Sequence, residues 1–62
     1  MRKKNLSVRE LRLSLRLSQK EFAKELGVCR QSITAWETGN RIPAYQTIRM
    51  IEGKYSITLK KG

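Results

Sequence analysis

The chain has 62 residues, of which 14 are Lys or Arg and 5 are Asp or Glu, so its formal charge at pH 7 is +9. A chain of this length forms one domain and buries only about 60% of the surface that the unfolded chain exposes, which excludes a second domain and a deep substrate cavity. So large a positive charge is typical of proteins that bind polyanions, with nucleic acid as the first candidate and an anionic membrane surface as the second.

The near or complete absence of cysteine, histidine and aspartate excludes several kinds of functional site. One cysteine and no histidine exclude an internal disulfide and a Cys/His zinc site, and without aspartate the chain offers no recognisable acid–base or metal-binding pattern. The longest apolar runs are a few residues long, against the roughly 20 of a membrane-spanning helix, and no signal-peptide core follows the initial MRKKN. We therefore expect a cytoplasmic protein that is not an enzyme and takes no cofactor, metal or small-molecule ligand.

The first predicted helix begins at Ser7, after a basic tail of residues 1–6. Leu13 falls off the apolar face of this helix, either as an exposed side chain or as a contact with a partner. The tail either keeps the chain soluble or, through Lys3 and Lys4, lies along DNA phosphates. The face itself carries residues at i, i+3, i+4 and i+7, namely Val8, Leu11, Arg12 and Leu15.

A second helix follows a break at Leu17 and ends at a glycine. Ser18 and Glu21 have the spacing of a capping box, which starts a helix. Gly27 comes directly after the last turn, where a left-handed residue is wanted and a side chain would cost about 1–2 kcal/mol. The buried stripe of this helix consists of Phe22, Ala23 and Leu26.

The third predicted helix covers residues 30–37 and stops at the sequence Thr-Gly-Asn of residues 38–40. Its inner face holds Ile33, Trp36 and Glu37, and its outer face consists of Arg30, Gln31, Thr34 and Ala35. Two short helices joined at a glycine corner, with a flanking helix on each side, form a helix-turn-helix.

A fourth helix and a short tail complete the chain. Pro43 keeps the residue before it out of helical geometry, and Tyr45, Ile48 and Ile51 then mark a helix that ends near Gly53. In the tail of residues 55–62, apolar Tyr55, Ile57 and Leu59 alternate with polar residues, which favours a strand. One short strand without a partner in the chain cannot stand alone, so the tail either covers the helices or pairs with a second copy.

The stretch LSQKEFAKELGVCRQSITAWETGNRIP, residues 17–43, carries a Leu-Ser-Gln start, a small Ala23, the Gly27 corner and a Trp-Glu-x-Gly ending. In these features the chain, from Leu11 to Ile51, resembles the DNA-binding domains of the phage repressor and Cro family, also called lambda-repressor-like or XRE-type. The expected fold is all-α, a compact bundle of four short helices over residues 7–54. The tail of residues 55–62, extended or partly helical, then replaces or truncates the fifth helix common in that family and is a possible dimer contact.

The outer face of the third helix predicts contacts with DNA bases. A helix fits the major groove, where each base pair presents a distinct set of donors and acceptors. Arg30 can donate two hydrogen bonds to guanine, Gln31 can pair with adenine, and each such pair discriminates by about 1–3 kcal/mol. We assign Thr34 and Ala35 to the same base-contacting set, with Ala35 against a thymine methyl group.

The resemblance implies further roles. Gln19 corresponds to a phosphate-contacting glutamine that also supports the first side chains of the next helix, which fits the affinity of a helix N-terminus for phosphate. Asn40 and Arg41 match positions on the DNA backbone, and Arg16 is a further basic candidate for phosphate contact. Alternatively, each of these is an ordinary solvated residue.

The resemblance also implies a partly buried ion pair between Arg12 and Glu37, which ties the first helix to the end of the third. Two positions depart from the family pattern. Cys29 stands where a capping serine or threonine is usual, as a small filler residue or, less simply, a reactive thiol. Glu52 replaces a small residue near the end of the fourth helix.

These observations support a sequence-specific transcription regulator of phage or bacterial type, Cro-like or repressor-like, bound as a homodimer to a pseudo-palindromic operator in the nucleoid. A rival hypothesis makes the chain an antitoxin or adaptor that docks another protein through the tail of residues 55–62. A membrane-surface peptide needs a long basic amphipathic helix, and the glycine and proline breaks disfavour one.

Overall fold

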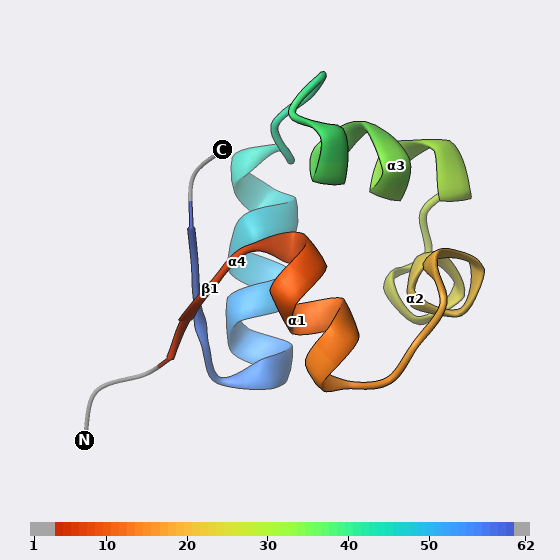
Figure 1. The fold of residues 1–62 in the computed structure, drawn as a ribbon. Coiled ribbons are helices and arrows are strands. Elements are labelled where there is room, and N and C mark those ends of the chain that lie inside the picture. Colours follow the sequence, from red (N-terminus) through yellow and green to blue (C-terminus); the bar gives the residue numbers. More distant parts are fainter. Residues whose placement is uncertain (1–3, 61–62) are drawn as a thin grey trace.

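The structure is a computed structural model and describes residues 4–60. Within them the chain forms four helices and a two-stranded sheet, so the prediction of a compact bundle of four short helices is confirmed (Figure 1). The helices α2 and α3 pack together on one side of the molecule, while the sheet packs against α4 on the other. The elements are β1 (Asn5–Leu6), α1 (Val8–Ser14), α2 (Gln19–Leu26), α3 (Arg30–Thr38), α4 (Tyr45–Tyr55) and β2 (Thr58–Leu59).

Two capping boxes start the first two helices. At α2, the Ser18 hydroxyl accepts from the Glu21 amide at 3.0 Å and the Glu21 carboxylate accepts from the Ser18 amide at 2.8 Å, as predicted. The same reciprocal pair, which the sequence analysis did not identify, joins Ser7 and Glu10 at α1. Both boxes satisfy backbone amides that have no partner inside the helix, and they place a carboxylate where the helix dipole favours it.

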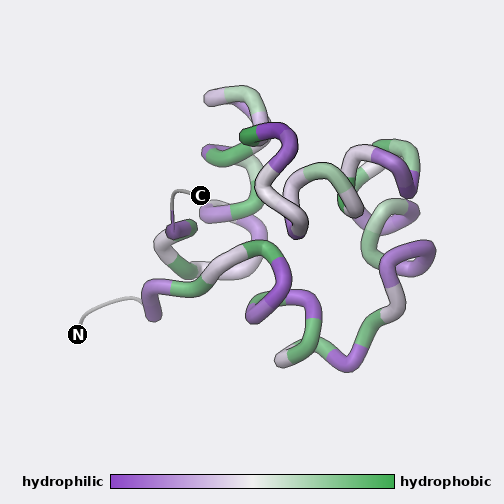
Figure 2. Tube along the Cα trace, turned by 45° about the horizontal axis from the view of Figure 1, so that its top comes forward, coloured by the Kyte–Doolittle hydropathy of each residue, from purple (hydrophilic) through white to green (hydrophobic). Residues whose placement is uncertain are grey.

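One hydrophobic core lies between the helices. Phe22, Ile33 and Ile51 have no exposed surface, and each comes from a different helix. Hydrophobic and hydrophilic residues are interspersed along the chain rather than separated into apolar and polar segments (Figure 2), because each helix buries only one side. The other buried members of the core are Val8, Leu11, Ala23, Leu26, Ile57 and Leu59.

The helix α4 continues past the end predicted at Gly53. It runs to Tyr55 and stops at Ser56, which takes the left-handed conformation with φ of 53°. The Tyr55 ring packs 6.1 Å from the Phe22 ring, centroid to centroid, and the next residue but one, Ile57, is buried. Burying these side chains outweighs the cost of about 1 kcal/mol for a glycine inside a helix.

The C-terminal tail finds its partner inside the chain. The expectation of an unpartnered strand is wrong, because Thr58 and Leu59 pair in parallel with Asn5 and Leu6, residues that the sequence analysis assigned to the basic tail. The Thr58 amide donates to the Lys4 carbonyl at 2.8 Å, and the Leu59 amide donates to the Glu52 carboxylate at 2.9 Å. Two strands of two residues each, from opposite ends of the chain, leave no local pattern by which their pairing could be predicted.

Apolar side chains of the tail join the core. Ile57 and Leu59 are each only 7% exposed, so their side chains pack inside the domain. Lys60 continues the strand direction and lies 3.4 Å from the Glu10 carboxylate. No helix in residues 4–60 combines the length and the apolar character needed to cross a membrane.

Candidate nucleic-acid interface

Gly27 makes the corner between α2 and α3. Its φ is 70°, in the left-handed region, and a Cβ built there would meet no atom within 4 Å, so the conformation rather than space requires glycine. The Val28 amide donates to the Ala23 carbonyl at 3.0 Å and the Gly27 amide to the Lys24 carbonyl at 3.3 Å, which together form a Schellman motif. The motif ends α2 within one residue and fixes the direction in which α3 starts.

The four residues predicted to contact bases lie together on α3. Ile33 anchors the inner face of this helix in the core, and Trp36 and Glu37 beside it are half-buried. On the outer face the side chains are exposed, apart from that of Ala35, which is half-buried. One shallow hollow in the surface is lined by Arg30, Gln31, Thr34, Ala35 and, from the following loop, Asn40.

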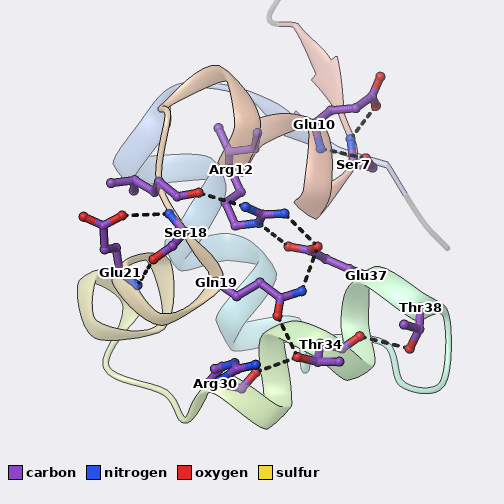
Figure 3. Close-up of polar contacts among 12 residues, drawn as sticks. Ser7, Glu10, Arg12, Ser18, Gln19, Glu21, Arg30, Thr34, Glu37 and Thr38 are labelled. Carbon is purple, nitrogen blue, oxygen red and sulfur yellow. Dashed lines mark hydrogen bonds and ion pairs between the residues drawn. The ribbon is translucent and has the colours of Figure 1, made fainter.

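The ion pair implied for Arg12 and Glu37 is present in the structure (Figure 3). Arg12 Nε lies 2.6 Å from Glu37 Oε2, its Nη2 lies 3.2 Å from Oε1, and its Nη1 donates to the Leu17 carbonyl at 2.8 Å. The two side chains are 13% and 6% exposed. The pair therefore joins α1 to the end of α3 as a partly buried contact.

The protonation states of this pair follow from its contacts. Burial raises the pKa of Glu37, but the hydrogen bonds from Arg12 and Gln19 and the Arg12 charge outweigh it, so the pKa lies below its ordinary value. The hydrogen bond to Glu37 raises the pKa of Arg12, and burial opposes it only in part. Both groups are charged at neutral pH, so the pair holds as an ionic contact.

Gln19 connects this pair to the outer face of α3. Its Nε2 donates to Glu37 Oε1 at 3.2 Å, and its Oε1 accepts from the Thr34 hydroxyl at 3.0 Å. Gln19 stands at the first position of α2, so its side chain spans from α2 to α3. The resemblance implied support for the first side chains of the next helix, whereas in the structure Gln19 bonds to Thr34, the fifth residue of α3.

A second hollow lies beside the first, around the start of α2. Its lining includes Gln19 and Arg30, together with Lys20, which the sequence analysis did not assign. Lys20 is exposed in the first turn of α2, directly after the proposed phosphate contact. Its position next to Gln19 was the sequence signal that could have identified Lys20 as a further phosphate contact, because phosphates attract basic side chains.

The other proposed phosphate contacts outside the third helix line neither of these two hollows, apart from Asn40, which lines the first. Arg16 is exposed between α1 and α2 with φ of 57°. Arg41 is exposed in the loop after α3, where its amide donates to the Ala35 carbonyl at 3.2 Å, and it lines a different hollow with Ile42 and Pro43. Lys4 is exposed beside β1, and Lys3 lies outside the described residues.

Cys29 is the residue before α3 and makes no side-chain cap, in keeping with the poor capping expected of cysteine. Its Sγ lies 3.4 Å from the Ser32 hydroxyl, and hydrogen bonding to Ser32 lowers the pKa of the exposed thiol. Residues 4–60 hold no group of three His, Cys, Asp or Glu side chains placed to bind a metal ion.

A family model described as Helix-turn-helix (HTH_3) matches residues 8–61. The chain belongs to this helix-turn-helix family. In such domains the second helix of the motif enters the DNA major groove, which makes the chain a DNA-binding domain with α2 and α3 as its motif.

One characterised relative is the HTH-type transcriptional activator BcrR of Enterococcus faecalis. The two sequences are 31% identical over 55 residues, which cover 89% of this chain and 27% of BcrR. The helix-turn-helix chain thus spans about a quarter of the length of this relative. No solved structure matches the chain significantly.

Proposed function

We propose that this helix-turn-helix chain is a sequence-specific transcription regulator, which occupies a pseudo-palindromic operator as a homodimer in the manner of Cro and phage repressors. The observation that carries the proposal is the outer face of α3, where four side chains suited to base contacts line one hollow while Ile33 anchors the opposite face. The name of the relative BcrR, a transcriptional activator, supports a role in transcription.

The base contacts are assigned to the exposed start of α3. Arg30 donates to guanine O6 and N7, Gln31 pairs with adenine, and Ala35 contacts a thymine methyl group. Within residues 4–60, neither the Arg30 guanidinium nor the Gln31 side-chain amide makes a hydrogen bond. Both groups are therefore available to contact bases.

The phosphate contacts are assigned to the rim of the two hollows. Gln19 keeps one Nε2 proton free after donating to Glu37, and this proton can reach a phosphate at the start of α2. Neutralising phosphates releases counterions, so binding weakens as salt rises. The rim residues are Gln19, Lys20 and Asn40, and the exposed Arg16 and Arg41 are assigned as further phosphate contacts outside the two hollows.

A homodimer is proposed because one module buries only about 600–1,000 Å² on DNA, too little for strong selectivity. Since Ile57 and Leu59 are used inside the domain, the contact between copies moves from the tail to Ile42 and Tyr45, whose side chains are 67% and 73% exposed. In this proposal a contact there holds two α3 helices along the same face of the duplex. The half-sites then lie about 34 Å apart, one turn of DNA.

The proposal is tested by selecting bound sequences from a pool of random duplexes at about 150 mM salt, where counterion-driven attraction alone is weak and indifferent to sequence. We expect an enriched inverted repeat whose half-site centres lie roughly 10 base pairs apart. A pool that stays random after repeated rounds overturns sequence-specific binding. Enrichment of a single half-site without symmetry overturns the homodimer.

A further inference from the structure

We propose that Thr34 acts in the major groove as a hydrogen-bond acceptor, and that it thereby selects a base carrying an exocyclic amino group, adenine or cytosine. The inference rests on the proposed function, in which α3 lies in the groove. Threonine hydroxyls in general either donate to bases or accept from them, and the surroundings of this one remove the first option.

The restriction begins at Glu37. An ionised carboxylate has no proton to donate, so each group that faces it must be a donor. Glu37 Oε1 accepts from Arg12 at 3.2 Å and from Gln19 at 3.2 Å. The Gln19 amide must therefore turn its nitrogen toward Glu37, because the reverse orientation would bring its carbonyl oxygen against the negative charge.

The orientation of Gln19 then decides the role of the Thr34 hydroxyl. With the nitrogen turned to Glu37, Gln19 Oε1 faces α3 and can only accept, and the Thr34 hydroxyl donates to it at 3.0 Å. The Arg30 carbonyl, one helical turn earlier, is a second acceptor for the same hydroxyl at 3.3 Å. A hydroxyl has one proton, and both of its acceptors here belong to the protein.

The exposed side of Thr34 consequently offers lone pairs only. Thr34 is exposed and lines the hollow with Arg30 and Gln31, which is the space proposed for the groove. In that groove the adenine N6 and cytosine N4 amino groups donate, whereas guanine O6 and N7 and thymine O4 accept. An accepting hydroxyl stabilises the first two and is electrostatically repelled by the others.

The test compares the wild type with two variants that separate the hydroxyl from the methyl group. Thr34→Val keeps the shape and loses the hydroxyl, and Thr34→Ser keeps the hydroxyl and loses the methyl group. Every base pair carries one exocyclic amino group in the major groove, on adenine or on cytosine, so selection from the random pool serves to identify the base pair of the half-site at which the Thr34 hydroxyl matters. We expect Thr34→Val to lose about threefold to tenfold of the preference there, the worth of one hydrogen bond, and Thr34→Ser to retain it.

Duplexes that lack the amino group make the contact itself measurable. At the position identified, adenine is replaced by purine or cytosine by 2-pyrimidinone. The loss of the amino group should weaken the wild type about threefold to tenfold and leave Thr34→Val unchanged. A wild type that binds equally well without the amino group at the position that responds to Thr34→Val overturns the proposal, and so does a Thr34→Val motif identical to that of the wild type.

A third variant tests whether Gln19 holds the proton of the Thr34 hydroxyl. Gln19→Met has similar length and no polar atoms, so the Thr34 proton keeps only the more distant Arg30 carbonyl as acceptor. The loss of a phosphate contact lowers affinity for all sequences alike, whereas the release of the hydroxyl relaxes the choice of base at one position. Uniformly reduced affinity with an unchanged preference overturns the positioning role of Gln19. A wild type that enriches no sequence refutes the proposed function, and this inference falls with it.

Discussion

Replacing Arg12 with alanine should unfold a large fraction of the molecules at room temperature. The substitution leaves the Glu37 carboxylate, whose side chain is 6% exposed, without its cation, and it also removes the donor to the Leu17 carbonyl. Breaking one side of a buried pair costs about 3–5 kcal/mol. A chain of 62 residues has a free energy of unfolding of roughly 3–9 kcal/mol, at about 0.05–0.15 kcal/mol per residue. The expected loss is therefore comparable to the total stability.

The assay is urea denaturation followed by Trp36 fluorescence and by far-ultraviolet circular dichroism. Lys60→Ala is the control, because it removes an ion pair whose side chains are 47% and 51% exposed, and it should leave the midpoint nearly unchanged. The double variant Arg12→Met with Glu37→Leu should recover most of the stability, since no charge remains buried. An Arg12→Ala curve that overlaps the wild-type curve would refute the reasoning.

Three further outcomes are expected. Because the folded-state pKa of Glu37 is lowered, stability should fall as the pH drops below about 4.5, and denaturation at a series of pH values should show a flatter dependence for Glu37→Gln. Gly27→Ala should lower stability by about 1–2 kcal/mol, whereas Gly53→Ala, in the helical part of α4, should raise it by about 0.5–1 kcal/mol; equal effects in urea melts would contradict the role given to the corner. Glu52→Ala removes the acceptor of the Leu59 amide, so that amide should exchange faster with deuterium in the variant, and unchanged protection would show that the contact does not hold β2.

The motif was predictable because its signals are local. The capping box of Ser18, the left-handed Gly27 and the apolar spacing of Phe22 and Ile33 each lie within a few residues of what they determine. The pairing of β1 with β2 was not predictable, because it joins residues 5–6 to residues 58–59 and depends on the folded bundle to bring them together. The same non-local packing carried α4 past Gly53 to a left-handed Ser56.

For the candidate site, helical spacing was enough to indicate which α3 side chains share a face, and Arg30, Gln31 and Thr34 are exposed there. Spacing does not give the hydrogen bond between Thr34 and Gln19, which depends on how α2 packs against α3. The chemistry of the Thr34 hydroxyl therefore follows only from the structure.

The central claim is that the outer face of α3 reads base edges, and the most direct test is selection from random DNA with the variant Arg30→Ala/Gln31→Ala. Gln46→Ala/Arg49→Ala is the matched control, since it removes the same two side-chain types from exposed positions of α4. We predict that the first variant loses the wild-type preference at the positions that these two side chains contact, while the control keeps the full motif. A motif that survives unchanged in Arg30→Ala/Gln31→Ala would contradict the account.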